Sequence, residues 1–246
     1  MADPRFYCPV PVLAEQELEL PASVAHHVRV RRLTDGDTVV LFDGRGGEIA
    51  GVLSFAEKKT LVLMGQHNPK EAELSGEITL IQALPSGDKM DWIIEKAVEL
   101  GVHRLIPVAA QRSVLKLSGP RLEKRLEHWR GIITSASEQC GRNRLMHLET
   151  PQTLEQALAA TSSRQRLLCD PEAVYTLAQH LEASLQEQKE VDALSLLIGP
   201  EGGWSPEEVA AATRQGVTKI KFGSRVLRTE TAGLAMVAAS TALLSW

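Results

Sequence analysis

The chain of 246 residues is poor in cysteine and lacks the histidine spacings of common metal sites. Its three cysteines, Cys8, Cys140 and Cys169, form no C-x-x-C motif and cannot all pair within one chain. We therefore expect reduced thiols in a reducing compartment. The seven histidines form no H-x-x-x-H or H-E-x-x-H pattern, so the sequence predicts no zinc site and no other bound metal.

Long apolar runs are also missing. The longest, such as residues 193–198, fall far short of the roughly 20 residues of a membrane-spanning helix. Residues 1–5 contain neither the basic nor the apolar region of a signal peptide. Apolar residues make up 43% and charged residues 24%, which are ordinary globular values. We expect a soluble, cytoplasmic protein of one or two domains with no membrane contact.

The formal net charge of −4 argues by itself against a nucleic-acid partner, but the average conceals a basic segment. Between residues 104 and 144 the acids are only Glu123, Glu127 and Glu138. The basic residues there are Arg104, Arg112, Lys116, Arg121, Lys124, Arg125, Arg130, Arg142 and Arg144. Phosphate binding depends on the charge of one face rather than on the total. A solvated helix face explains the same excess equally well.

The first 70 or so residues are predicted to be rich in β-strands. Apolar or alternating runs cover residues 38–42, 48–55 and 60–64, and Gly/Asp turns separate them. Short strands and tight turns favour a small barrel. The polar, proline-containing stretch 66–75 is the best candidate for a linker.

From residue 77 onward the pattern changes to strands that alternate with helices. Such alternation predicts a parallel sheet covered by helices. The expected strands are 78–83, 105–108, 166–169, 194–198 and 218–222, and the expected helices include 88–100, 121–139 and 231–244. The last helix is rich in Ala, Gly and Ser, so it is either deeply buried or lies at a dimer interface.

A glycine-rich loop, Gly199-Pro200-Glu201-Gly202-Gly203, connects a predicted strand to a predicted helix. Ser205 and Glu208 form a capping box for that helix, with Pro206 in its first turn. Ligands of α/β proteins bind at the carboxyl ends of strands, and glycines expose main-chain groups to a ligand. The loop matches neither the Walker A motif nor G-x-G-x-x-G. A tight turn without a ligand is the alternative.

A second polar loop, residues 221–232, leaves the next strand at Gly223 and enters the last helix. It contains two arginines, a glutamate and two threonines within eight residues, which is too polar for an ordinary buried connection. We expect the two loops to lie at adjacent strand ends and to form one pocket. That pocket offers main-chain groups to a polar cofactor and arginine to an electron-rich substrate.

These two loops resemble the signature of the ribosomal RNA small-subunit methyltransferase E family, which belongs to the SPOUT class of S-adenosylmethionine-dependent RNA methyltransferases. The segments that match are 199–203 and 227–232 in the loops, 26–32 with 36–37 and 41–44 near the N-terminus, and 96–102 with 137–144 in the middle. The family often has Leu where Val30 and Phe222 stand here, and Trp204 occupies a variable position.

The resemblance implies a PUA-like β-barrel over residues 1–74 that binds RNA. It implies an α/β methyltransferase domain over 75–246 with a parallel sheet and a C-terminal deep trefoil knot. It also implies a homodimer with S-adenosyl-L-methionine as cofactor. The implied cofactor-binding residues are Cys169, Ile198, Gly199, Pro200, Glu201, Gly202, Phe222, Gly223, Ser224, Val226, Leu227, Arg228 and Thr229.

The family reaction methylates N3 of one uridine in the decoding region of 16S rRNA, with the assembled 30S subunit as the expected substrate. Attack by N3 on the sulfonium methyl requires loss of the N3 proton. Arg228 is the first candidate to stabilise charge on the uracil oxygens, and Glu201 and Glu230 are candidate proton acceptors. For Glu230 an ion pair with Arg225 or Arg228 is the favoured interpretation. Candidate phosphate-binding residues are Arg5, Arg29, Arg31, Arg32, Arg112, Arg142 and Arg144.

Three alternatives accompany this prediction. The chain could be a catalytically idle rRNA-binding assembly factor, or a ribose 2′-O-methyltransferase on the same scaffold. The adjacent His26 and His27 could suggest a metal site. On a strand, however, neighbouring side chains face opposite ways, so we interpret both histidines as structural.

Overall fold

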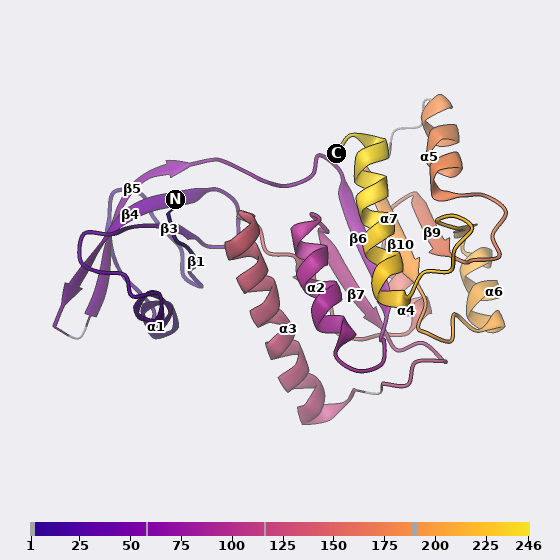
Figure 1. Cartoon of the computed structure of the whole chain (residues 1–246), viewed down its shortest axis with the longest axis horizontal. Coiled ribbons are helices and arrows are strands. Elements are labelled where there is room, and N and C mark those ends of the chain that lie inside the picture. Colours follow the sequence, from indigo (N-terminus) through magenta and orange to yellow (C-terminus); the bar gives the residue numbers. More distant parts are fainter. Residues whose placement is uncertain (1–2, 58, 116, 188–190) are drawn as a thin grey trace. The chain divides into compact units, whose positions relative to one another are not determined.

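The computed structural model describes residues 3–57, 59–115, 117–187 and 191–246 (Figure 1). The chain divides into two compact units. Unit 1 comprises residues 1–73 and 134–145, and unit 2 comprises residues 74–133 and 146–246. The sequence places a boundary near residue 74 but does not predict that residues 134–145 cluster with the N-terminal unit. Lys116, one of the basic residues noted above, lies outside the described residues.

Unit 1 contains a five-stranded sheet in the order β1-β3-β4-β5-β2. The strands are β1 Arg5–Tyr7, β2 Glu17–Glu19, β3 Thr38–Phe42, β4 Glu48–Ala56 and β5 Lys59–Asn68. β1 pairs with β3 in parallel, and the other neighbours are antiparallel. The predicted β-rich character is confirmed. Residues 66–68 of the expected linker belong to β5.

A helix, α1 (Ala22–Val30), interrupts the strands of unit 1 and corrects the expectation for the histidine pair. His26 and His27 lie on this helix and not on a strand. Val24, Ala25 and Val28 share its buried face, which packs into the core with Phe6 and Leu41. This spacing of apolar residues is that of an amphipathic helix. The helix was missed because its apolar stripe is only one turn and a half long.

Unit 2 is built on a six-stranded sheet in the order β11-β9-β10-β6-β7-β8. Every neighbouring pair in it is parallel, which confirms the predicted sheet. Its strands are β6 Glu77–Ala83, β7 Arg104–Val108, β8 His147–Leu148, β9 Gln165–Cys169, β10 Ala193–Ile198 and β11 Thr218–Ile220.

Helices cover both faces of this sheet, as a parallel sheet requires. They are α2 Lys89–Glu99, α3 Gly119–Cys140, α4 Leu154–Ala159, α5 Leu177–Gln186, α6 Pro206–Arg214 and α7 Thr229–Leu244. α7 packs on β6 and β10 together with α2 and α5, whereas α4 contacts α6 and β7 (Figure 1). The C-terminal end of α3, from Thr134, belongs to unit 1.

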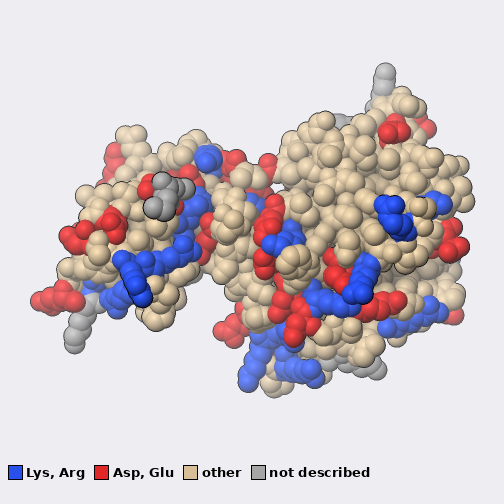
Figure 2. Space-filling model, in the orientation of Figure 1, with Lys and Arg blue, Asp and Glu red and all other residues tan. Residues whose placement is uncertain are grey.

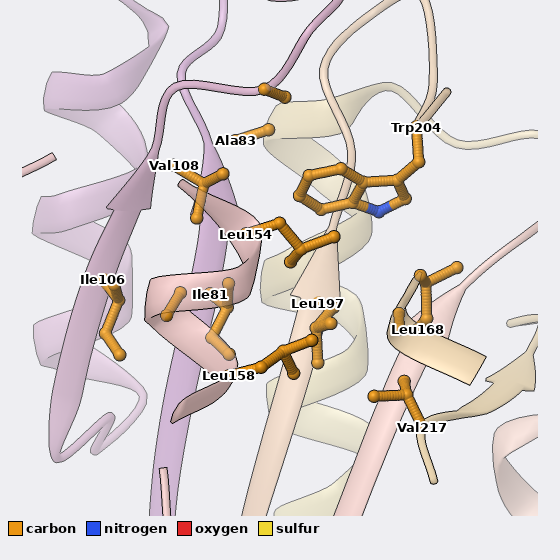
Figure 3. Packing of buried hydrophobic residues seen from close by; sticks show 13 residues of the cluster. Ile81, Ala83, Ile106, Val108, Leu154, Leu158, Leu168, Leu197, Trp204 and Val217 are labelled. Atoms are coloured by element: carbon orange, nitrogen blue, oxygen red, sulfur yellow. The ribbon is translucent and has the colours of Figure 1, made fainter. Parts of the chain in front are cut away.

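The core on the α4 and α6 side is a cluster of aliphatic residues with Trp204 at one end. Figure 3 shows the Trp204 ring beside Leu154, at the end of the sheet where Ala83 also lies. Trp204 is 7% exposed, although it directly follows the glycine-rich loop. The cluster therefore anchors that loop to the sheet. The trefoil knot implied by the resemblance stays a prediction.

Candidate active site

A cavity of about 630 Å³ lies at the carboxyl ends of the unit 2 strands. The ends of β9, β10 and β11 contribute to it through residues 168–171, 198–204 and 221–229. This is the position at which open α/β sheets bind ligands. Its volume lies within the range of small-molecule sites, about 300 to 1,000 Å³.

The two predicted loops do line one cavity, but they do not follow adjacent strands. β9 lies between β10 and β11 in the sheet. The end of β9 therefore supplies Leu168, Asp170 and Pro171 to the lining in addition to the predicted Cys169. The sequence gives the order of strands along the chain, whereas neighbours in the sheet depend on crossover connections.

Residues 199–203 form a tight turn that leaves main-chain groups at the cavity. The amide of Gly203 donates to the carbonyl of Pro200 at 2.8 Å, and Gly203 has φ +69°, a left-handed conformation that favours glycine. A Cβ atom added at Gly203 or Gly223 would meet no atom within 4 Å. Open space beside these glycines leaves room for a ligand.

The helix start after this turn is as predicted. The Ser205 hydroxyl accepts from the amide of Glu208, and the Glu208 carboxylate accepts from the amide of Ser205. Glu208 also accepts from the amide of Gln111 at 3.0 Å. The capping box therefore fixes both the direction of α6 and the segment after Val108.

The two loops are tied to each other by a buried hydroxyl. Thr229 donates from Oγ1 to the carbonyl of Gly199 at 2.7 Å and accepts from Gln82 Nε2 at 3.0 Å. Gln82 is fully buried in β6 and also donates to the carbonyl of Ala83. This buried polar side chain near the end of β6 thus positions the first residue of the glycine-rich turn.

Nearly all predicted cofactor-binding residues line the cavity. Those that do are Cys169, Ile198, Gly199, Pro200, Glu201, Gly202, Phe222, Gly223, Val226, Leu227, Arg228 and Thr229. Ser224 and the catalytic candidate Glu230 are not among the lining residues. The sequence interpretation missed Lys89, Leu168, Asp170, Pro171, Gly203, Trp204, Val209, Lys221, Arg225 and Ala232. Of these, Asp170-Pro171 carried a signal, because it is a turn at a strand end.

Arg228 lies at the cavity with its side chain exposed. Within the described part of the chain its guanidinium makes no hydrogen bond or ion pair. Its main chain is fixed, because its carbonyl accepts from the amides of Thr231 and Ala232 in the first turn of α7. A fixed backbone with a free guanidinium suits a residue that binds an incoming oxygen anion.

Glu201 is held as a carboxylate. It accepts hydrogen bonds from the amide and hydroxyl of Ser86 and from Lys89 Nζ at 2.8 Å. Partial burial acts to raise the pKa of Glu201, but these hydrogen bonds prevail and lower it to about 2. A carboxylate with so low a pKa is a weak proton acceptor at neutral pH.

Glu230 forms an ion pair, but its partner is not the arginine that the sequence suggested. Its Oε2 atom lies 3.5 Å from Nζ of Lys89. Lys89 is more than one hundred residues away in the sequence, so no local pattern could identify it. One ammonium group therefore serves two carboxylates at the edge of the cavity.

The thiol at the cavity is unreactive. Burial, followed by the charge of Asp170, raises the pKa of Cys169 to about 11. The thiol is therefore protonated at neutral pH and offers a small apolar surface rather than a nucleophile.

Two of the predicted phosphate-binding arginines are engaged within unit 1. Arg5 forms an ion pair with Glu48, donates to Asn143 Oδ1 at 2.6 Å and lies over the Phe42 ring at 5.0 Å. Arg142 is 3% exposed and donates from Nε and Nη2 to Glu73 at 3.0 and 2.6 Å. Both side chains serve the fold of unit 1, unlike the solvent-facing phosphate contacts that the sequence suggested.

The remaining candidates are more accessible. Arg144 is paired with Glu71 at 3.3 Å but half exposed, and Arg29 donates to Thr60 Oγ1 at 3.3 Å. Arg31 and Arg32 are exposed at the end of α1. In unit 2, Arg112 donates to the carbonyl of Gly202 at 2.9 Å and so braces the glycine-rich turn.

Part of the basic excess between residues 104 and 144 is paired with acids from elsewhere in the chain. Arg104 pairs with Glu149, and Arg125 lies near Asp88 and Asp91. Figure 2 shows acidic groups beside some of the basic ones on the face in view, while other basic groups there have no acidic neighbour. The charge count of that segment alone therefore overstates its positive potential.

His27 has the structural role expected for it. Its ring packs edge-on against Phe6 at 5.1 Å, and its Nδ1 lies 3.7 Å from Glu138. The described residues contain no group of three or more His, Cys, Asp or Glu side chains arranged to hold a metal ion. No helix among them is long and apolar enough to span a membrane.

Comparisons with known proteins agree with this architecture. Residues 72–241 match the family described as an RNA methyltransferase domain, and residues 20–63 match the RNA methyltransferase PUA domain. The Ribosomal RNA small subunit methyltransferase E of Bacillus subtilis is 32% identical over 86% of this chain and 84% of its own length. The protein of that name from Synechocystis is 31% identical over 94% of this chain and 75% of its own length.

Solved structures are similar over the whole chain. A Ribosomal RNA small subunit methyltransferase E from Neisseria gonorrhoeae bound to S-adenosyl methionine superposes with a TM-score of 0.88 at 33% identity, covering 98% of each chain. A protein from Legionella pneumophila, solved with the bound cofactor SAM, has a TM-score of 0.90 at 29% identity and the same coverage.

Proposed function

Because this chain belongs to the ribosomal RNA small subunit methyltransferase E family, we propose that it methylates N3 of a uridine in the decoding region of 16S rRNA, with S-adenosyl-L-methionine as methyl donor. The observation that carries this proposal is the cavity at the strand ends, which is lined by a glycine-rich turn and by an exposed arginine that has no side-chain partner among the described residues.

The cavity residues fit the cofactor. Carbonyl and amide groups of residues 198–203 and 222–229 suit the polar edges of an adenosine, and Leu168, Ile198 and Leu227 suit its ring faces. The open space beside Gly203 and Gly223 allows close approach to the backbone. When bound, the cofactor supplies an activated sulfonium methyl group.

The protein positions the uracil and manages its charge. N3 would lose its proton to solvent, which leaves negative charge on the uracil oxygens, and would then take the methyl group, with the neutral thioether of the cofactor as leaving group. We assign Arg228 to stabilise that charge. Glu201 is assigned to hold the loop, because its low pKa disfavours proton acceptance. Glu230, paired with Lys89 outside the cavity lining, is the weaker catalytic candidate.

RNA contacts are assigned to the exposed arginines Arg29, Arg31, Arg32 and Arg144. Arg31 and Arg32 carry charges without an acidic partner within hydrogen-bond distance in the described part of the chain. Phosphate contacts of this kind supply affinity that falls with salt. Arg5 and Arg142 are assigned to the stability of unit 1. We expect the protein in the cytoplasm, because its proposed substrate is ribosomal RNA.

A homodimer is part of this proposal. Large apolar side chains are exposed along the loops near the cavity: Val174 is 78%, Tyr175 60% and Val226 78% exposed. The amide of Lys221 donates to the carbonyl of Tyr175, so these residues belong to neighbouring segments. Exposed apolar clusters are typical of interfaces. Light scattering after gel filtration should give twice the mass of the 26.9 kDa chain.

The test is methyl transfer from labelled S-adenosylmethionine to 30S particles and to free 16S rRNA, both lacking the modification, followed by nucleoside mass spectrometry. We expect 3-methyluridine, with 30S particles as the better substrate. A 2′-O-methylated nucleoside would instead support a ribose methyltransferase. Cofactor binding without any methylated product would support an idle assembly factor.

A further inference from the structure

Lys89 is the first residue of α2 and faces the cavity from outside both predicted loops. Its ammonium lies 2.8 Å from Oε1 of Glu201, in the first loop, and 3.5 Å from Oε2 of Glu230, where the second loop enters α7. We propose that Lys89 is a positioning residue that fixes the two cofactor loops relative to each other. This inference rests on the proposed function.

The contact between Lys89 and Glu201 is supported by further hydrogen bonds. Glu201 is held by Lys89 and also by the amide and hydroxyl of Ser86, at 3.1 and 2.7 Å. Ser86 lies in the short connection between β6 and α2, so the carboxylate is tied to this connection as well as to α2. Charge-assisted hydrogen bonds of this length are among the stronger ones in proteins.

The contact between Lys89 and Glu230 has no such support among the described residues. Oε2 of Glu230 is shielded from solvent and makes no hydrogen bond with the described residues, and Lys89 is its ion-pair partner. A shielded carboxylate without a counter-charge is costly. Without the ammonium, Glu230 would turn toward water, and the first turn of α7 that follows Arg228 would shift with it.

Lys89 therefore complements the inner tie between Thr229 and Gly199. Thr229, which is buried, links the loops through its hydroxyl, and the more exposed Lys89 links them through charge. Two ties at different points fix an orientation as well as a distance. Because the ammonium directs its donors to two carboxylates, Lys89 acts through Glu201 and Glu230 rather than as a cofactor ligand.

The experiment compares Lys89→Met with Lys96→Met on the same helix. Lys96 is also shared by two carboxylates, those of Glu95 and Glu99 at 2.7 Å each, but it does not line the cavity. Cofactor affinity by calorimetry and single-turnover methylation at saturating cofactor are measured for both variants. We expect Lys89→Met to lose about 10-fold in affinity and to methylate more slowly, and Lys96→Met to match the wild type.

Two further variants separate positioning from a simple loss of stability. Lys89→Arg keeps the charge and should recover most of the affinity. Glu201→Gln should lower affinity, and its combination with Lys89→Met should cost less than the two separate losses together, because both remove one link. These two variants also report on the proposal if Lys89→Met does not fold.

Equal affinity and rate for Lys89→Met and Lys96→Met would overturn the proposal. Fully additive losses in the double variant would also overturn it, because Lys89 would then act independently of Glu201. Failure of the proposed function has a different signature, since the wild-type protein would then bind no S-adenosylmethionine or transfer no methyl group.

Discussion

Arg142 in unit 1 and Arg228 in unit 2 are both arginines within segments that resemble the family, residues 137–144 and 227–232. In the structure they differ completely. Arg142 is 3% exposed and saturated by Glu73, whereas Arg228 is exposed at a cavity without a side-chain partner among the described residues. An arginine whose donors are already used stabilises a fold, and one whose donors are free is available to a ligand.

The same contrast holds for the surroundings of the two residues. Around Arg142, the side chains of Arg5, Glu48, Glu73 and Asn143 satisfy one another. Around Arg228, glycines leave open space and main-chain groups, and the nearby charges of Lys89, Glu201 and Glu230 are arranged to hold loops. The polar side chains around Arg142 thus bind one another, whereas main-chain and side-chain polar groups around Arg228 line the cavity of unit 2.

The largest effect on stability is expected from Arg142→Ala. Removing one partner of a buried pair leaves Glu73 uncompensated, which costs on the order of 3 kcal/mol. Urea denaturation measures this loss. Arg144→Ala removes a half-exposed partner of Glu71 and serves as the control, with an expected loss below about 1 kcal/mol. Equal losses in the free energy of unfolding for the two variants would contradict the structural role assigned to Arg142.

A smaller effect, on binding, is expected from Gly202→Val. Gly202 lies beside Arg112 in the glycine-rich turn and a Cβ there makes only ordinary contact, at 3.4 Å, so the fold should persist. The branched side chain should obstruct the cofactor, and its affinity should fall at least about 10-fold, or 1.4 kcal/mol. Unchanged calorimetric affinity in a folded variant would contradict the assigned role of this turn.

The exposed arginines of unit 1 should affect RNA binding without affecting the cofactor. We expect Arg31→Ala with Arg32→Asn to reduce the slope of log K against log salt by about 1 to 2. Asn is chosen because Arg32 has φ +57°, which Asn tolerates. Arg164→Ala with Arg214→Ala removes the same charge from unit 2 as a control. Identical slopes for both double variants would remove Arg31 and Arg32 from the interface.

The smallest effect is expected in the acid stability. Because the pKa of Glu201 is lowered to about 2 from 4.5, folding favours its ionised form. Its contribution to stability is complete above about pH 5 and is lost as the pH falls toward 2. Glu201→Gln should therefore show a flatter decline of Tm between pH 5 and 2 than the wild type. Parallel declines would show that its hydrogen bonds do not persist in solution.

The parallel sheet of unit 2 could be predicted from local patterns, whereas the lining residues that were predicted followed from the family resemblance. The strands, the Ser205–Glu208 capping box and the two loops each have a recognisable pattern within a short continuous segment of the sequence. Lys89 could not be found in this way, since its contacts with Glu201 and Glu230 depend on how α2 packs beside α7. The pairing of Arg142 with Glu73 is equally non-local.

The central claim is that the Arg228 guanidinium, which has no partner among the described residues, acts on the substrate. Its most direct test is single-turnover methylation by Arg228→Lys at saturating S-adenosylmethionine. Lysine keeps the charge but loses the planar fork that reaches a uracil oxygen, so the rate should fall about 10²-fold, as on removal of one oxyanion donor. Cofactor and RNA affinities should stay close to wild type. A wild-type rate at saturation, with weakened cofactor binding, would contradict the account and make Arg228 a cofactor-binding residue only.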